Sequence, residues 1–329
     1  MQGIAGYVIR RLLLAPLILL FISVVTFSLG RWAPGDYIDI QAGPRATPET
    51  LERIKEARGL NDPVYDQYFR YLGNFVQGDL GTSVIYRGVD VEDVIFPRIW
   101  VTLQYNIVVL ILTFSIGIPV GIWAALKRGT WMDPLSIGTF LFFASIPVVV
   151  SIPLLQWLFA VKLDWLPTGG WNVHEFLGIE IGIFSREAVL PILILTLPGV
   201  AGLARYMRSQ VLEVLDQDFV RTARSKGLRE TSVVARHVTR NALLPVATIM
   251  GFELAALTGG SIFVETFLGI PGIGRYAFET IGSRDYDSLM AIVLLGSAIF
   301  ITTNLIVDIA YGFIDPRIRL SGGAGSSTS

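Results

Sequence analysis

The sequence predicts an all-α polytopic membrane protein with six transmembrane helices and a helical external loop between the first two. Three observations lead to this fold class. The 329-residue chain has a mean hydropathy of +0.58, and only 16% of its residues are charged, against about a quarter in soluble proteins. Its apolar runs reach roughly the 20 residues that cross a bilayer. Arginine and lysine residues gather between those runs, mainly on one predicted side of the membrane.

The predicted spans begin with an apolar run that follows Arg10 and Arg11. We expect a retained helix rather than a cleaved signal peptide, because the run is long and no A-x-A-like site follows it. Prolines in the second and third spans are compatible with membrane helices when neighbours satisfy the freed carbonyl groups. Gly117 and Gly121 provide a small-residue surface for close helix packing. The spans cover approximately residues 12–30, 99–126, 135–161, 188–204, 243–267 and 289–313.

The distribution of cations predicts the orientation of the chain. Six spans place both termini on the same side of the membrane. Short segments on that side carry cations, whereas the short loops on the other side mix cations with acids. The positive-inside rule therefore places both termini and the loop 208–243 in the cytoplasm. Outside that loop, the cations on this side are Arg10, Arg11, Lys127, Arg128, Arg317 and Arg319.

Residues 31–98 form the long external loop, whose pattern predicts two amphipathic helices. A Thr-Pro-Glu sequence that starts at Thr47 supplies an N-cap, a first-turn proline and a first-turn acid, and Gly59 ends the helix. An Asp-Pro pair ending at Pro63 starts the second helix in the same way. The two helices could dock on the membrane, on a partner or on the protein's own outer ends.

The predicted organisation has four parts. The cytoplasmic N-terminus and first span (1–30) precede the external helical region (31–98). A core with five spans (99–314) contains the cytoplasmic loop 208–243. The cytoplasmic tail (315–329) is rich in glycine and serine, a composition typical of a flexible end.

The composition excludes several classes of function. A net charge of −1 gives no reason to expect a nucleic-acid partner. The chain has no cysteine and only two histidines, His174 and His237, which lie far apart, so neither a metal centre nor a catalytic residue is expected. No lysine follows a glycine, so a G-x4-G-K-[ST] phosphate-binding loop is absent from the sequence. If this protein needs ATP, another chain must bind it.

One segment of the loop, VRTARSKGLRETSVVARHVTRNALLP (220–245), is unusually polar for this chain. Its pattern predicts a short helix, a break at Gly227 where φ > 0 is allowed, and a second short helix. Small residues near the break would let another protein approach closely. A basic loop resting on anionic lipid headgroups is the alternative, which explains the charge but not the small-residue corner. The first helix is predicted to present the stripe Leu212, Leu215, Phe219 and Thr222.

The same segment carries a two-part pattern of residues. It consists of Asp218, Phe219, Val220, Thr222, Ala223, Lys226, Gly227 and Leu228, then Arg236, His237, Arg240, Asn241, Ala242, Leu243 and Pro245. The pattern resembles the cytoplasmic EAA loop of bacterial ABC-importer permeases of the dipeptide/oligopeptide (peptide/nickel) family, first-subunit type. The generic motif begins Glu-Ala-Ala where this chain has Arg-Thr-Ala, as is usual in the peptide-type branch.

The resemblance extends from end to end. RRLLLAPLILLFISVVTFSLGRWAPGD is similar to the family's first span and the four residues after it, 33–36. TPETLERIKEARGLNDPVYDQYFRYLGNFVQGDLGTS is similar to its external region, and ETFLGIPGIGR (265–275) to a later segment. NLIVDIAYGFIDPRIRL, with its residues 315–319, is similar to the family's last span. Together and in this order, these segments imply the type I ABC-importer permease fold.

The resemblance also implies a mechanism: a permease that forms the translocation path for di- or oligopeptides in the cytoplasmic (inner) membrane of a prokaryote. The implied partners are a second homologous permease, two ATPase subunits, an extracytoplasmic solute-binding protein and membrane lipid. ATP and Mg²⁺ would bind to the ATPases, and a coupling helix in the loop would dock in an ATPase groove. The expected coupling residues are Arg221, Thr222, Ala223, Arg224, Lys226, Gly227, Leu228 and His237.

Glu253 is the remaining candidate site residue, because it lies inside the predicted fifth span. Acids in membrane spans usually face an interior or a water-filled cavity, so we expect Glu253 to line the cavity. Contact with the cargo, or a structural role at a subunit interface, stays open. Two other functions also stay open. The same mechanism could carry nickel chelates or oligosaccharides, and an ion-driven secondary transporter would need more intramembrane acids or paired broken helices.

Overall fold

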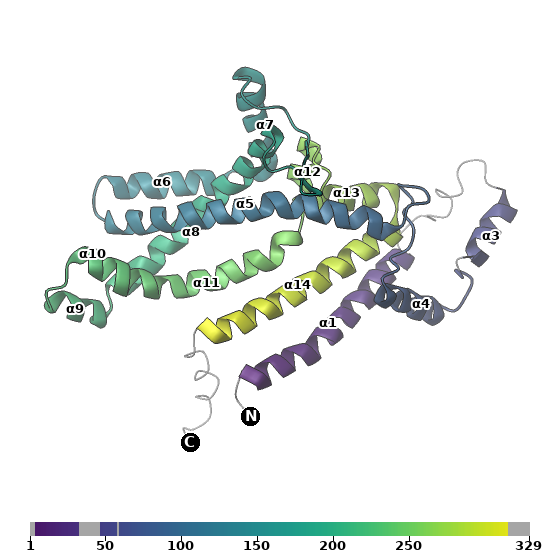
Figure 1. The fold of residues 1–329 in the computed structure, drawn as a ribbon, viewed down its shortest axis with the longest axis horizontal. Coiled ribbons are helices and arrows are strands. Elements are labelled where there is room, and N and C mark those ends of the chain that lie inside the picture. The colour runs from purple at the N-terminus through teal and green to yellow at the C-terminus, as the bar shows by residue number, and fades with distance from the viewer. Residues whose placement is uncertain (1–3, 33–46, 58, 315–329) are drawn as a thin grey trace. The chain divides into compact units, whose positions relative to one another are not determined.

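The computed structural model describes residues 4–32, 47–57 and 59–314. Residues 33–36 and 315–319, which carry part of the family resemblance, and the predicted tail 315–329 lie outside the described residues. The described chain is helical almost throughout, which confirms the predicted all-α class (Figure 1). It forms two compact units. The first comprises Met1–Val101, Thr258–Ile262 and Pro271–Ser329, and the second comprises Thr102–Leu257 and Phe263–Ile270.

The described elements are helices and one two-stranded hairpin. The α-helices are α1 (Ile4–Trp32), α3 (Pro48–Ala57), α4 (Val64–Gln77), α5 (Val91–Leu126), α6 (Met132–Ser145), α7 (Val148–Gln156), α8 (Val189–Leu215), α9 (Asp218–Ser225), α10 (Glu230–Ser232), α11 (Thr239–Ala255), α12 (Ile262–Leu268), α13 (Ile273–Ser283) and α14 (Tyr286–Ile314). The π-helical turns are η1 (Trp157–Lys162) and η3 (Val233–Val238), and the 3-10 turns are η2 (Arg186–Ala188) and η4 (Ala256–Thr258). The strands β1 (His174–Phe176) and β2 (Ile179–Ile181) pair antiparallel.

In the first unit, α1 packs along α14 and α4 packs against α1. Tyr68 of α4 shares a hydrogen bond of 2.8 Å with Ser23 of α1, and its ring centroid lies 5.5 Å from that of Phe27. Burial raises the pKa of the Tyr71 phenol on the same helix, with a further contribution from the negative charge of Asp287. The α4 helix is thus held on the first span through aromatic side chains.

The two helices expected between the first and second spans are present as α3 and α4. The backbone N–H of Thr50 donates to Oγ1 of Thr47 at 3.3 Å, which is the predicted N-cap contact. Gly59 follows α3 with a φ of +63°, and Pro63 directly precedes α4. Turn chemistry at these positions was therefore sufficient to place both helices.

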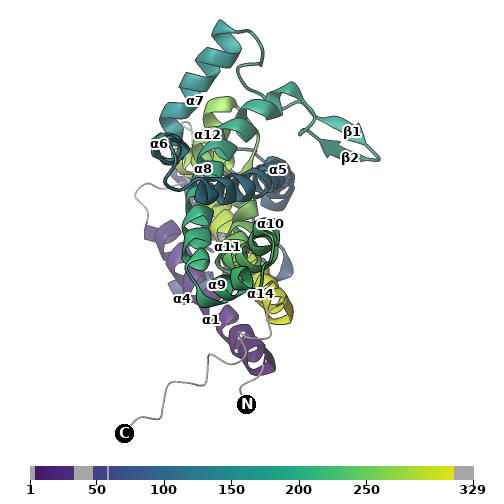
Figure 2. The same cartoon turned by 90° about the vertical axis from the view of Figure 1, so that its left-hand side faces the viewer.

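The second unit contains helices of alternating direction: α5 from Thr102 onward, α6, α8 and α11 (Figure 1). The turn between α5 and α6 lies at the same end of these helices as α9 and α10. The β1–β2 hairpin stands away from α9 within this unit (Figure 2). One end of the unit therefore carries all of the polar segment singled out in the sequence.

A cluster of buried apolar side chains holds the helices together at that end of the second unit. It brings side chains of α9 and η3 against α5, α8 and α11, and every member is at most 6% exposed. Its members are Ala125, Leu203, Met207, Val211, Val220, Ala223, Val233, Val238, Ala242 and Val246. The polar segment is consequently packed onto the helices and does not hang from them as a loose loop.

The observed helices differ from the predicted spans in length. Within the described residues, four helices are long and apolar enough to cross a membrane, or five if α6 and α7–η1 form one span bent by 95°. The helix that contains the predicted second span extends further, because α5 starts at Val91 with acids at Glu92 and Asp93 that favour a helix start. The helix that contains the predicted fourth span, α8, continues to Leu215.

The predicted third and fifth spans are interrupted. The third bends at Ile146–Pro147, where Ile146 takes the extended conformation that a following proline imposes. The fifth is divided among α11, η4 and α12. The 17 residues of α11 measure about 26 Å at 1.5 Å per residue, slightly less than the ~30 Å hydrocarbon core.

Candidate functional site

The candidate site is the polar segment that follows α8, and its first feature is a two-residue break. The α8 helix ends at Leu215, Asp216 and Gln217 separate it from α9, and Gln217 is extended with φ −76° and ψ 148°. The break changes the helical register, so the predicted stripe of Leu212, Leu215, Phe219 and Thr222 is wrong as a single face. The buried residues of α9 are instead Val220 and Ala223.

The outward face of α9 is a mixture of apolar and polar side chains. Phe219 and Leu228 are 43% and 44% exposed, although both are large apolar residues in a cation-rich segment. The side chains of Arg221, Thr222, Ser225 and Lys226 are also exposed. We call the exposed residues Phe219, Arg221, Thr222, Ser225, Lys226, Gly227 and Leu228 the α9 face. Phe219 was not among the predicted contact residues, and the break at Gln217 is the signal that places it outward.

Gly227 forms the corner between α9 and α10. Its φ is +75°, a conformation that residues with a Cβ rarely adopt, and a Cβ there would meet no atom within 4 Å. The corner is closed by a hydrogen bond of 2.9 Å from the backbone N–H of Gly227 to the carbonyl of Arg224. The predicted break at this residue is therefore confirmed, and the space around it is open.

An ion pair fastens α9 to α10 across the corner. Arg224 donates from Nε and Nη2 to the two carboxylate oxygens of Glu230 at 3.2 and 2.7 Å. The hydrogen bond from Arg224 lowers the pKa of Glu230, and the same bond raises the pKa of the guanidinium. Arg224 is thus occupied within the segment and shapes the corner.

Four other cations of the segment have no hydrogen-bond or ion-pair partner among the described side chains: Lys226, Arg229, Arg236 and Arg240. All four are exposed. They leave a net positive surface around the corner. That surface suits a partner with acidic groups.

The remaining predicted residues occupy two different settings. Ala223 is 5% exposed and belongs to the apolar cluster. Its small side chain therefore packs α9 onto the rest of the chain and is not accessible to a partner in this structure. His237 is half-buried in η3, and its carbonyl accepts a hydrogen bond of 2.6 Å from Asn241. In η3 the buried residues Val233 and Val238 are five apart, as the wider π-helical turn requires.

Two acids in apolar helices have opposite surroundings. Glu253 is exposed on α11 and has no hydrogen-bond or ion-pair partner among the described residues. Glu265 of α12 is fully buried, and Oε1 accepts hydrogen bonds from Thr102 at 2.8 Å and Tyr105 at 2.5 Å. Glu265 is satisfied by its own chain and is structural, whereas Glu253 is available to water, cargo or another subunit. In the described part of the chain, no three acidic or histidine side chains gather in a metal-binding group.

The chain is similar to known membrane components of transport systems. The family described as binding-protein-dependent transport system inner membrane component matches residues 117–320, and the corresponding N-terminal family matches residues 4–85. A solved chain of the MetNI methionine ABC transporter in an inward-facing form has a TM-score of 0.48 and 18% identity, covering 69% of this chain and 95% of that one.

Curated relatives cover nearly the whole length of both proteins. The oligopeptide transport system permease AppB of Bacillus subtilis is 39% identical over 96% of this chain and 99% of its own. The dipeptide permease DppB of Alkalihalophilus pseudofirmus is 36% identical over 95% and 99%, and the glutathione permease GsiC of Escherichia coli O6:H1 is 39% identical over 95% and 99%. The chain therefore belongs to the binding-protein-dependent transport system inner membrane component family and is a multi-pass permease subunit of an ABC importer.

Proposed function

We propose that this permease imports peptides, and that ATPase subunits drive it by docking on the α9 face. Support for the cargo comes from relatives named for oligopeptide, dipeptide and glutathione transport. Support for the docking site comes from one observation: the α9 face exposes Phe219 and Leu228 on either side of an open corner at Gly227. Large apolar side chains exposed together in a polar segment are typical of a protein–protein contact.

In this proposal the chain pairs with a second permease of similar fold, and two ATPase subunits bind ATP and Mg²⁺. A solute-binding protein delivers the cargo on the other side of the membrane. Both termini and the α9 face are cytoplasmic, which agrees with the cations that have no partner in the segment. Arg221, Thr222, Lys226, Gly227 and Leu228 touch the ATPase, Arg224 holds the corner, and Ala223 and His237 support α9 from behind.

Closure of the two ATPases would move the α9 faces of the two permeases toward each other. Because α9 belongs to the same apolar cluster as α5, α8 and α11, its displacement reaches these helices through packed side chains. The cavity between the permeases then opens outward, and cargo enters it. Glu253, exposed on α11, lines that cavity.

A bulky residue at the corner tests the docking site. Gly227→Trp adds a large side chain at an exposed corner where a Cβ would meet no atom of this chain within 4 Å, so we expect it to clash with a docked partner. Overpacking a fitted contact costs about 1–3 kcal/mol, which weakens docking about tenfold or more. Gly227→Ala carries the same positive-φ strain without the bulk. Gly178→Trp is a second control, because Gly178 has a φ of +79° and equally open surroundings in the β1–β2 hairpin, away from α9 (Figure 2).

We expect Gly227→Trp to reach the membrane but to lose co-purifying ATPase and peptide uptake together, while the two controls retain most of both. Normal uptake by a correctly inserted Gly227→Trp complex would reject the α9 face as the docking site. The cargo is tested separately with labelled di- and oligopeptides in vesicles containing the complete transporter. Uptake of a nickel chelate or an oligosaccharide in place of peptides would reject that part.

A further inference from the structure

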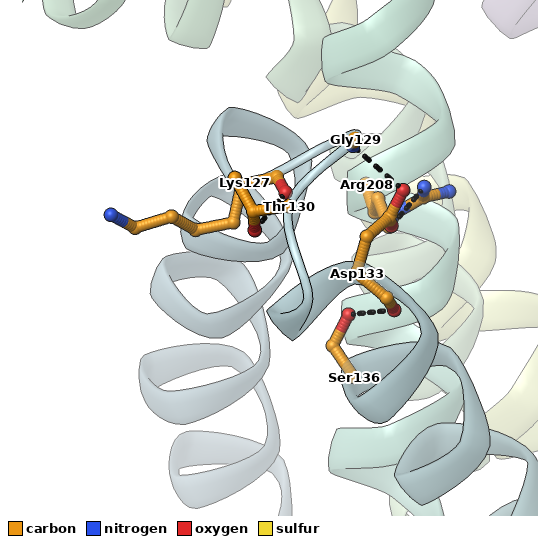
Figure 3. A network of polar contacts seen from close by, with 6 residues as sticks. All are labelled: Lys127, Gly129, Thr130, Asp133, Ser136 and Arg208. Atoms are coloured by element: carbon orange, nitrogen blue, oxygen red, sulfur yellow. Dashed lines mark hydrogen bonds and ion pairs between the residues drawn. The ribbon is translucent and has the colours of Figure 1, made fainter.

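One ion pair lies at the same end of the second unit as the α9 face and is much less exposed than the pair at the corner. Nη2 of Arg208 in α8 donates to Oδ1 of Asp133 in α6 at 2.6 Å, and the two side chains are only 18% and 16% exposed (Figure 3). In contrast, the Arg224–Glu230 pair is 42% and 58% exposed. A pair shielded from water holds its geometry more firmly than a surface pair.

Asp133 also fixes the turn that joins α5 to α6. Its Oδ2 accepts a hydrogen bond of 3.1 Å from the backbone N–H of Gly129, and its carbonyl accepts one of 2.9 Å from Ser136 (Figure 3). Thr130 donates to the carbonyl of Lys127 at 2.7 Å and closes the other side of the turn. A single carboxylate therefore connects α8, the α5–α6 turn and the first turn of α6.

Besides the ion pair, a small apolar cluster joins α6 to α8. Phe140 of α6 packs with Ala201 and Ala204 of α8, so no large α8 side chain interlocks with α6 in this cluster. Alanine side chains have no polar atoms, so this cluster adds no directional contact between the two helices. The Arg208–Asp133 pair is a polar contact between these helices that opposes movement of α6 along α8.

Arg208 is also adjacent to the route from the α9 face. Met207 and Val211, which flank it on α8, belong to the apolar cluster with Val220 and Ala223 of α9. Nε of Arg208 is buried without a hydrogen-bond partner among the described groups, so Asp133 is the principal partner of this cation. At its other end α6 meets the 95° bend into α7.

We propose that Arg208 and Asp133 are positioning residues, which make α6 move with α8 when an ATPase displaces α9. The proposal rests on the proposed function, since it needs a partner that moves α9. The pair transmits motion to the α6–α7 bend by preventing α6 from slipping along α8. Neither residue touches ATP or cargo.

The natural absence of cysteine allows a direct test in the assembled transporter. Nitroxide labels at Phe142→Cys in α6 and Ser209→Cys in α8 report the position of one helix along the other. Labels at Ser209→Cys and Leu244→Cys form the control pair, because α11 is joined to α8 through the apolar cluster and not through this ion pair. All three positions are exposed. Distances are measured by electron spin resonance with and without a non-hydrolysable ATP analogue.

With Arg208 intact, we expect the 142–209 distance to stay the same when the ATP analogue binds. In Arg208→Ala we expect it to change or split into two populations, while the 209–244 distance behaves as before. Peptide uptake per ATP hydrolysed should fall roughly 2- to 30-fold, the range over which single side chains alter coupling between sites. Arg208→Lys keeps the charge and should lose less uptake than Arg208→Ala. With Arg208 intact, Asp133→Glu should likewise lose less uptake than Asp133→Ala.

Two results would overturn the proposal: an unchanged 142–209 distance in Arg208→Ala, or a parallel change in both label pairs, which would mean general loosening. A third label at Asp216→Cys, an exposed residue just before α9 and outside the α9 face, separates this failure from failure of the proposed function. If that label does not respond to the ATP analogue in the intact transporter, docking at the α9 face is rejected and the positioning role falls with it.

Discussion

Gly121 of α5 lies directly against the backbone of Ala204 in α8. A Cβ at residue 121 would stand 2.5 Å from the Ala204 carbonyl oxygen and 2.7 Å from Cβ of Met207. Gly117, one turn earlier, is close to Leu203 in the same way, at 3.0 Å. The small-residue surface predicted from the sequence is therefore the contact between α5 and α8.

We expect Gly121→Ala to force the two helices apart and to destabilise the second unit by about 1–3 kcal/mol. The measurement is the thermal midpoint of the detergent-solubilised transporter. Gly202→Ala on α8 is the matched control, because a Cβ there meets nothing within 4 Å and alanine favours a helix. Equal midpoints for the two variants would contradict close packing at Gly121.

Tyr105→Phe removes one of the donors to the buried carboxylate of Glu265. A hydrogen bond contributes about 0.5–1.5 kcal/mol to stability, and its loss leaves a buried acceptor with one donor fewer, so we expect a lower thermal midpoint. Tyr206→Phe on α8 should change little, since the Tyr206 hydroxyl has no hydrogen-bond partner among the described groups. An unchanged thermal midpoint in Tyr105→Phe would mean that the hydrogen bond from Tyr105 to Glu265 does not contribute to stability.

The Arg224–Glu230 pair should make the α9–α10 corner sensitive to acid. The pKa of Glu230 is lowered from its ordinary 4.5 in the folded chain, so its contribution to stability is complete above pH 4.5 and is lost as the pH falls through the lower, folded value. A nitroxide at Ser225→Cys should become more mobile below pH 4.5. Glu230→Gln should remove this dependence, and an identical acid response in that variant would refute the assignment.

Glu253→Gln should affect cationic cargo more than neutral cargo. The carboxylate is exposed on α11, and its charge would attract positive groups in the cavity. The comparison is the uptake of lysine-containing and alanine-only peptides of equal length. Equal effects on both, or none, would make Glu253 a structural residue at a subunit interface.

Reporter fusions test the orientation. A reporter that is active only in the cytoplasm should be active when fused after Arg319 and silent when inserted near Gly59. The reason is the cation distribution, which predicts that the termini lie inside and the α3–α4 region outside. The opposite pair of results would reverse the proposed topology, and with it the access of an ATPase to the α9 face.

Local chemistry made much of this fold predictable. Thr47 and Pro63 start helices, and Gly227 forms a corner, because these residues act through their own backbone or nearest neighbours. The ends of α8 and the bend between α6 and α7 were less accessible, because apolar runs continue past the points where the backbone changes. Hydropathy reports whether a segment prefers an apolar environment to water. It does not report where the helix axis changes direction.

The buried face of α9 and the Arg208–Asp133 pair could not be predicted for a different reason. Whether Ala223 or Phe219 points inward depends on the register after the break at Gln217, which no periodicity across the break can supply. Asp133 and Arg208 are 75 residues apart in sequence, and the local sequence around each residue does not indicate that the two form a pair. Such contacts follow from the packing of α6 on α8.

The π-helical turn Val233–Val238 sets the angular phase between the α9–α10 corner and α11. Its hydrogen-bond ring holds one residue more than an α-helical turn, and one residue corresponds to about 100° of rotation about a helix axis. Removing a single residue from this turn would restore α-helical hydrogen bonding and rotate the α9–α10 corner about the axis of α11. The side chains that form the α9 face would all remain, yet they would be aimed elsewhere. The extra residue thus sets the orientation of the α9 face relative to α11. Insertion or deletion of one residue in this turn would change the proposed coupling although no contact residue is substituted.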